Sequence, residues 1–136
     1  MLYISAPFGN YLAFPGAVRT RGTFTLRRRG GVAWRVWRVL ASLRYNWRQQ
    51  SWVNKMGLPN PGIDSLDVMQ DYGDDLVSIH GFSKNEWLDL VLWPYRNVEF
   101  NLSCPNVGHR PDVFEVAPAV ELALRTKVRV VCKLPP

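Results

Sequence analysis

The chain of 136 residues is long enough for one domain with a hydrophobic core, and its 47% hydrophobic and 21% charged residues exclude a disordered polypeptide. The formal net charge is +6, and nine arginines fall between positions 19 and 48, so that stretch is expected to attract phosphate, acidic lipid or nucleic acid. Two widely separated cysteines, no signal-peptide pattern and no apolar run of roughly 20 residues indicate a cytoplasmic protein without a membrane span.

The first half of the chain alternates short apolar runs with turns rich in glycine, proline and arginine. We expect strands at residues 2–5, at 17–21 leading into G-T-F-T-L at 22–26, and at 51–54. The run R-R-R-G-G at 27–31 is too charged for a core and is predicted to be a surface loop. From 32 to 45, apolar residues recur at spacings of three and four, which predicts a helix. Prolines and glycines between 55 and 62 indicate a rigid loop.

The second half of the chain alternates strands with helices. We expect strands at residues 76–80, 98–103 and 128–134, and helices at 63–72, 83–93 and 112–126. Ser83 and Glu86 form the capping-box pattern S-K-N-E. In the last helix the expected buried residues are Phe114, Val116, Ala117, Val120, Leu122 and Leu124. This alternation predicts an α/β fold with a parallel sheet or barrel.

The stretch V-E-F-N-L-S-C-P-N at 98–106 is the main candidate for chemistry. It alternates apolar and polar residues like a strand and then stops at Pro105, so the thiol of Cys104 is expected at the carboxyl end of a strand, between two asparagines. In barrels of alternating strands and helices, active sites lie at that end. From these residues alone, an inert half-buried cysteine in a strand-ending turn is the favoured interpretation.

Five stretches occur in a characteristic order: S-A-P-F-G-N (5–10), G-T-F-T-L (22–26), N-K-M-G-L-P-N-P-G-I-D (54–64), N-L-S-C-P-N (101–106) and C-K-L-P-P (132–136). Together they resemble the dihydroorotate dehydrogenase family, flavin-dependent (β/α)8 barrels of pyrimidine biosynthesis. The resemblance covers the whole chain but only the N-terminal half of that barrel, about five βα units. It implies a single partial TIM barrel domain over residues 1–136, with a basic Arg- and Trp-rich insertion at about 27–50.

The resemblance also implies site residues and an FMN cofactor. Cys104 matches the general base that removes a proton from dihydroorotate. The positions matching substrate-binding residues are Asn54, Met56, Gly57, Leu58, Asn101 and Asn106. The positions matching FMN-binding residues are Gly9, Gly22, Thr23, Asn101 and Lys133. The flavin-phosphate loops of the family lie in its C-terminal half, so activity is expected to need that half or a dimer partner.

Two features leave the branch of the family open. Cys104 is the base of the cytosolic class, whereas the Gly22-Thr23 pair is more similar to the membrane-associated class, which leaves a peripheral membrane location open. The electron acceptor, whether fumarate, a nicotinamide cofactor or quinone, is not identified by these residues.

A different class of function is also open: a non-catalytic half barrel that dimerises through its open edge and holds nucleic acid or a membrane through its basic segment. The simpler interpretation of that segment is a helix packed on the barrel, with Trp34, Trp37 and Trp47 inward and the arginines in water.

The remaining cysteine and the histidines are expected to have no metal-binding role. Cys132 is expected in the core, His80 facing the barrel mouth and His109 on the surface. No pair among Cys104, His109, Cys132 and His80 has metal-ligand spacing, so no metal site is predicted.

Overall fold

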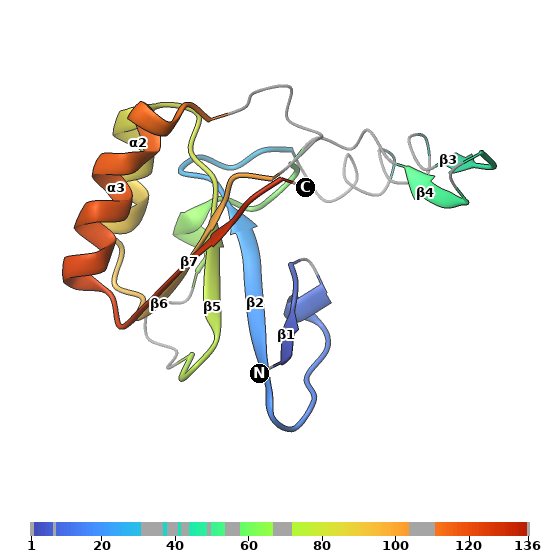
Figure 1. Cartoon of the computed structure of the whole chain (residues 1–136), viewed down its shortest axis with the longest axis horizontal. Helices are drawn as coiled ribbons and strands as arrows, with labels where there is room; N and C mark the ends of the chain where they lie inside the picture. The colour runs from blue at the N-terminus through green and yellow to red at the C-terminus, as the bar shows by residue number, and fades with distance from the viewer. Residues whose placement is uncertain are drawn as a thin grey trace.

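The computed structural model describes residues 2–6, 8–30, 37, 41, 44–48, 50–53, 58–66, 72–103 and 111–135. Its centre is a sheet in the order β1-β2-β5-β6-β7, in which every neighbouring pair is parallel (Figure 1). The strands are β1 (Leu2–Ile4), β2 (Ala17–Phe24), β5 (Leu76–Ile79), β6 (Asn97–Asn101) and β7 (Arg129–Lys133). The predicted α/β fold, a five-stranded parallel half barrel, is confirmed.

Two helices, α2 (Lys84–Val91) and α3 (Val113–Thr126), lie side by side on one face of this sheet (Figure 1). Ser83 begins α2 as predicted, because its hydroxyl accepts a hydrogen bond from the Glu86 amide at 3.3 Å. The reciprocal bond of the capping box is displaced by one residue, since the Glu86 carboxylate accepts from the amide of Phe82 at 2.9 Å. Asp112 caps α3 by accepting from the Phe114 amide at 2.9 Å.

The hydrophobic core fills the layer between the sheet and these helices. Alternate residues of β5 and β6 enter it and meet Trp87 and Leu90 from α2. The strand residues in this layer are Val77, Ile79, Val98 and Phe100. The intervening residues leave the sheet on the opposite, concave face, where Ser78, Glu99 and Asn101 are also buried. A polar face turned away from the helices is therefore built into the sheet.

The buried face of α3 agrees with the expected one at Val116 and differs from it at the other positions. Val116, Ala119 and Ala123 are buried at spacings of three and four, whereas Phe114 is 83% exposed and Leu124 66% exposed. Ala117 is exposed as well, and Val120 and Leu122 are only half-buried. The prediction followed the largest apolar side chains, but the helix packs through its alanines, which allow a close approach to α2 and the sheet.

Strand β2 contains a bulge at the Gly22-Thr23 pair. Arg21 is the register partner of Val77 and Phe24 is the partner of Ile79, so three steps on β2 match two on β5. As a result Thr20, which pairs with Leu76, and Thr23 both face the concave side although they are three positions apart, a spacing that places residues of a regular strand on opposite faces.

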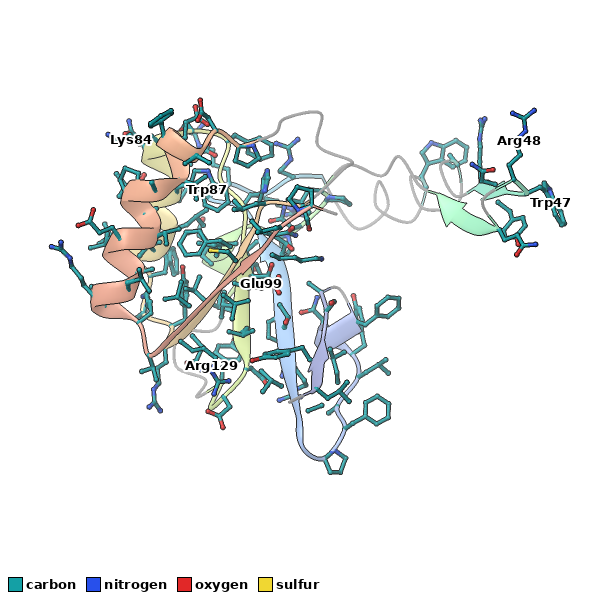
Figure 2. All side chains as sticks on the ribbon, viewed as in Figure 1. Trp47, Arg48, Lys84, Trp87, Glu99 and Arg129 are labelled. Atoms are coloured by element: carbon teal, nitrogen blue, oxygen red, sulfur yellow. The ribbon has the colours of Figure 1, made fainter. Side chains whose placement is uncertain are left out.

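The basic segment between β2 and β5 contains an antiparallel hairpin of β3 (Arg44–Asn46) and β4 (Ser51–Val53). The short strand expected at 51–54 is confirmed, but the helix expected up to residue 45 is wrong at its end, because residues 44–46 pair with β4. Trp37 is 69% exposed and Trp47 82% exposed, so the inward packing predicted for these two is wrong; Trp34 lies outside the described residues. Trp47 packs edge-to-face on Tyr45 at the end of the hairpin remote from the sheet (Figure 2).

The remaining described elements are short turns of 3₁₀ helix, η1 (Phe8–Asn10) and η2 (Ile63–Ser65). The helix expected at 63–72 is thus one turn where it is described, and residues 67–71 lie outside the described part. Arg27, Arg28, Arg29 and Gly30 are exposed, as the surface-loop prediction requires. Across the described ranges, no helix has the length and apolar character needed to cross a membrane.

Candidate functional site at the carboxyl ends of the strands

Six of the predicted site residues fall in the described part of the chain: Gly9, Gly22, Thr23, Leu58, Asn101 and Lys133. The other five, Asn54, Met56, Gly57, Cys104 and Asn106, lie outside the described residues. Three of the six, Thr23, Asn101 and Lys133, come from the carboxyl ends of β2, β6 and β7. They therefore meet at one end of the sheet, on its concave face.

A buried hydrogen-bond network connects three strands on this face. The side-chain amide of Asn101 donates to the Thr23 hydroxyl at 2.8 Å. The hydroxyls of Thr23 and Ser78 lie 2.9 Å apart, and Ser78 donates to a carboxylate oxygen of Glu99 at 2.8 Å. Since β5 lies between β2 and β6, the direct contact of Thr23 with Asn101 requires a strongly curved sheet with a small side chain, Ser78, between them.

Asn101 is 7% exposed and is held from two further directions. Its side-chain oxygen accepts from the amide and the hydroxyl of Ser103, each at 3.3 Å. Its backbone carbonyl accepts from Nδ1 of His80 at 2.8 Å. His80 is fully buried against the rings of Phe82 and Trp87, so it supports Asn101 rather than facing an open barrel mouth as predicted.

Lys133 is the register partner of Asn101 in the β6–β7 pair, and its carbonyl accepts from the Leu102 amide at 3.0 Å. Partners in a parallel pair leave the sheet on the same face. Lys133 and Asn101 thus occupy neighbouring positions on one face at the carboxyl end of the sheet. Together they can meet a partial negative charge and a hydrogen-bond acceptor on one planar ligand.

The two predicted glycines bring backbone close to this edge. Gly22 has φ +103°, and a Cβ there would lie 2.7 Å from the Phe24 ring and 2.8 Å from the Ser78 carbonyl oxygen. A Cβ on Gly9 would overlap the backbone of Thr20. Asn10 joins the two segments, because it donates to the Gly22 carbonyl at 3.0 Å and accepts from the Gly22 amide at 2.9 Å. Both positions require glycine for steric reasons.

Leu58 is half-buried in a loop that Asn60 attaches to the end of β2. The Asn60 side-chain oxygen accepts from the amides of Thr25 and Gly62, at 3.0 and 2.9 Å, and its nitrogen donates to the Leu58 carbonyl at 2.9 Å. The described part of this loop, residues 58–62, is therefore rigid, and it begins beside the site. Its rigidity fits either a substrate loop or the plain proline turn.

Cys132 is exposed, so the prediction that it lies in the core is wrong. It follows Val130 on the helix-facing side of β7, but β7 is the edge strand, and Val130 packs against the core whereas Cys132 does not. The partial burial that does remain raises the pKa of the Cys132 thiol. Within the described ranges, no group of three histidine, cysteine or acidic side chains is placed to hold a metal ion.

Four side chains of the network and its supports were not among the predicted site residues: Asn10, Ser78, His80 and Glu99. Asn10 stands in the first of the five motifs, and Glu99 lies on the polar face of the strand at 98–103, so both had a sequence signal. His80 was expected at the barrel mouth from its place at the end of a strand, but not as a support of Asn101. Ser78 had no sequence signal, because a serine in a strand gains a role only when the neighbouring strands are known.

The fold and this edge define a class: an α/β protein forming part of a (β/α)8 barrel, with polar side chains gathered at the carboxyl ends of its strands. The comparisons with known proteins then give the particular relatives. The chain is a partial match to curated dihydroorotate dehydrogenases, in agreement with the resemblance of its motifs. No family model matches it.

The catalytic subunit of dihydroorotate dehydrogenase B (NAD(+)) of Caldicellulosiruptor bescii is 30% identical over 129 residues, covering 88% of this chain and 40% of the relative. The protein of the same name in Methanocaldococcus jannaschii is 34% identical over 104 residues, covering 62% of this chain and 33% of the relative. A putative dihydroorotate dehydrogenase A (fumarate) of Streptococcus agalactiae is 36% identical over 74 residues, covering 45% of this chain and 24% of the relative. The chain thus spans 40% or less of the length of these relatives.

Proposed function

We propose that this chain supplies the N-terminal half of an FMN-dependent oxidoreductase of the dihydroorotate dehydrogenase type, which converts dihydroorotate or a similar compound to its unsaturated product in pyrimidine biosynthesis. The C-terminal half would come from further sequence, another chain or a dimer partner, and this chain alone would be inactive. Residues 1–136 act as a single partial barrel domain, with the segment at about 27–50 as an insertion. A cytoplasmic location follows from the same proposal.

The observation that carries the proposal is the meeting of Thr23, Asn101 and Lys133 on one concave edge. These three residues come from positions 23 to 133 of the chain, yet the fold places them at the carboxyl ends of strands, where barrels of this class hold their ligands. Identity of 30% to a dihydroorotate dehydrogenase over most of the chain supports the same chemistry.

The donors at this edge fit a flavin ring. Asn101 uses one proton of its side-chain nitrogen on Thr23, and in the described part of the chain the other has no partner. Lys133 adds a positive charge beside it, and a positive charge near the ring stabilises a reduced flavin. When bound, FMN would supply the acceptor for the hydride of the substrate.

The chain's own residues would bind the substrate and move a proton. In this proposal Cys104 takes the proton from the substrate carbon, while Asn101 and Asn106 orient the ring by donor and acceptor contacts, each worth about 0.5–1.5 kcal/mol net. Asn54, Met56, Gly57 and Leu58 form the loop that covers the ring. Gly9, Gly22 and Thr23 present backbone and a hydroxyl to the flavin.

The test is a titration of the purified chain with FMN, followed by anaerobic addition of dihydroorotate. A second sample contains the C-terminal part of the C. bescii relative, beyond the region that matches this chain. The proposal expects FMN to bind at least to the mixture and its absorbance bands to bleach on addition of substrate. Absence of FMN binding and of bleaching in both samples would contradict it.

A second function is favoured by one specific observation, the separation of charge along the chain. Residues 1–63 carry 10 basic and no acidic residues, whereas residues 64–136 carry 7 basic and 11 acidic residues, which accounts for the net +6. Trp47, Arg44 and Arg48 are exposed on the β3–β4 hairpin. This alternative is a non-catalytic half barrel that binds a polyanion, either nucleic acid or an anionic membrane. It predicts binding that weakens steeply with salt and no bound flavin.

A further inference from the structure

We propose that Glu99 is a positioning residue, which fixes through the hydroxyls of Ser78 and Thr23 the end of the Asn101 carboxamide that faces a bound ring. The inference rests on the proposed function, in which Asn101 contacts flavin and substrate. Glu99 itself lies two residues before Asn101 on the same face of β6, in the middle of the sheet (Figure 2), and is 6% exposed. It acts on the ligand only through other side chains.

The direction of the network follows from the carboxylate at its end. An ionised carboxylate only accepts hydrogen bonds, so the single hydroxyl proton of Ser78 points to Glu99. The Ser78 oxygen must then accept from Thr23, and the Thr23 oxygen must accept from Asn101. Each group has one proton to give, so no step of the relay can be reversed while Glu99 is charged. The nitrogen of the Asn101 carboxamide is thereby directed toward Thr23.

Ser103 requires the same orientation of the Asn101 carboxamide, because it contacts the oxygen end of that group. Its backbone amide can only donate, and it lies 3.3 Å from the Asn101 side-chain oxygen. A reversed carboxamide would place two donors against each other at Ser103 and two acceptors against each other at Thr23. The relay and Ser103 therefore agree on one orientation, in which the remaining side-chain proton of Asn101 is available to an acceptor on the ligand.

Burying the carboxylate of Glu99 costs desolvation free energy, and a neutral acceptor for the Ser78 hydroxyl would cost less. The Glu99 carboxylate is almost entirely removed from water, and no ion pair to it exists among the described residues. On β7, the cation of Arg129 is in register with Asn97, whereas the partner of Glu99 is Val131. A buried carboxylate without an ion pair in the described part of the chain has a clear use here, because only an obligate acceptor gives the relay a single direction.

The ligand chemistry follows from that direction. Asn101 presents a donor and Lys133 a cation, so this edge selects a ring that offers an acceptor, a carbonyl oxygen or an unprotonated ring nitrogen. A ring presenting an N–H at the same place would be rejected.

The experiment compares Glu99→Gln with the wild-type chain and with Glu121→Gln, whose carboxylate is exposed on α3 and paired with Arg125. Glutamine at position 99 can donate as well as accept, so both relay directions become available. The first readout is the side-chain amide signal of Asn101 in ¹⁵N-labelled, ligand-free protein. We expect Glu99→Gln to broaden or shift this signal and speed its hydrogen exchange, with Glu121→Gln like the wild type.

The second readout is FMN affinity, which we expect Glu99→Gln to lower about three- to tenfold, the effect of one misdirected hydrogen bond. An unchanged Asn101 amide signal in folded Glu99→Gln would overturn the inference, whatever the flavin result. Failure of the wild-type chain, alone and with its C-terminal half, to bind FMN would overturn the proposed function while the amide signal still decides the relay. If Glu99→Gln does not fold, Ser78→Ala interrupts the same relay at its centre and is judged by the same amide signal.

Discussion

Gly22 is the residue on which the shape of the site edge depends most directly. It combines a positive φ of +103° with contacts that leave no room for a Cβ, against the Phe24 ring and the Ser78 carbonyl. Gly16 has a positive φ of +76° but nothing within 4 Å of its Cβ position. Both positions favour glycine through their positive φ, but only at Gly22 is there also no space for a Cβ. A comparison of the two positions therefore separates the conformational effect of a substitution from its steric effect.

We predict that Gly22→Ala lowers the free energy of unfolding by about 1–3 kcal/mol more than Gly16→Ala, because only the former overpacks its surroundings. Urea unfolding of both variants measures the difference. Equal losses would show that close packing at Gly22 contributes nothing beyond its backbone conformation.

At Cys104 and Lys133 the proposed roles predict opposite kinetic effects. In the enzyme completed by its C-terminal half, Cys104→Ala should slow flavin reduction by dihydroorotate about 10²–10⁴-fold, the range for loss of an acid–base group, and leave flavin content intact. Lys133→Ala should weaken flavin binding or lower its reduction potential. Stopped-flow reduction and flavin content measure both. Loss of flavin from Cys104→Ala without a change in rate would contradict the base assignment.

Between α2 and β7, Tyr95 and Lys127 form a contact that should give the fold its alkaline sensitivity. The Tyr95 hydroxyl donates to the Leu90 carbonyl at 2.5 Å, and Lys127 lies over its ring while donating to the Trp93 carbonyl at 2.6 Å. Burial raises the pKa of Tyr95 above its ordinary value of 10.0 and lowers the pKa of Lys127 below 10.5.

We predict that the contribution of Tyr95 to the free energy of unfolding is complete below about pH 10 and declines as the pH rises from there, because only the unfolded chain ionises easily. Lys127 acts in the opposite direction. Between its lowered pKa and its ordinary pKa of 10.5 the unfolded chain binds more protons than the folded one, so the contribution of Lys127 to the free energy of unfolding increases as the pH rises. Tyr95→Phe should therefore cost about 0.5–1.5 kcal/mol at neutral pH and remove the alkaline decline. Tyr11→Phe, at an exposed site, is the control. A decline that persists in Tyr95→Phe would contradict this origin.

Helix α3 allows a second prediction, because Ala119 and Ala123 are buried together with Val116, whereas Phe114 and Leu124 are exposed. Ala123→Leu should destabilise the protein by about 1–3 kcal/mol by overpacking, whereas Leu124→Ala should change stability by less than about 0.5 kcal/mol. Thermal unfolding of the two variants provides the comparison. A larger loss for Leu124→Ala would mean that the exposed face of α3 is covered in solution.

The elements were predictable where a local signal sufficed. The parallel strands followed from apolar runs and the starts of α2 and α3 from Ser83 and Asp112, because strand pattern and capping are encoded within a few residues. The buried face of α3 was mispredicted because hydrophobicity does not show how closely two helices approach. In the hairpin at 44–53 the second strand was predicted but the first was assigned to a helix, because the pairing of the first strand depends on residues across a turn.

For the molecule as a whole, the resemblance predicts candidate site residues but not the connections between them. Thr23, Asn101 and Lys133 were predicted singly, and their common edge is a property of the curved sheet. The relay through Ser78 to Glu99 joins three strands that are distant in sequence, so no motif contains it. Five predicted site residues, Cys104 among them, fall outside the described part and stay predictions.

The edge of the sheet at β7 offers a test of assembly. Cys132 is exposed there, so native iodoacetamide treatment followed by mass mapping should label it in the isolated chain, slowly at neutral pH and faster as the pH rises toward its raised pKa. If a C-terminal half pairs with β7, its addition should slow the labelling several-fold. The same rate with and without that half would contradict pairing at this edge.

The bulge in β2 has a consequence for how this strand tolerates changes in length. In a regular strand, inserting or deleting one residue turns every following side chain to the other face. Here the extra residue at Gly22 interrupts the alternation, so residues 17–21 and residues 23–24 follow two separate alternating patterns. A shortening of the strand by one residue at Gly22 would convert it to regular alternation, in which Thr23 becomes the register partner of Ser78 and stays on the same face as Thr20. Strand β2 could therefore lose this one residue and still present the Thr23 hydroxyl to the site.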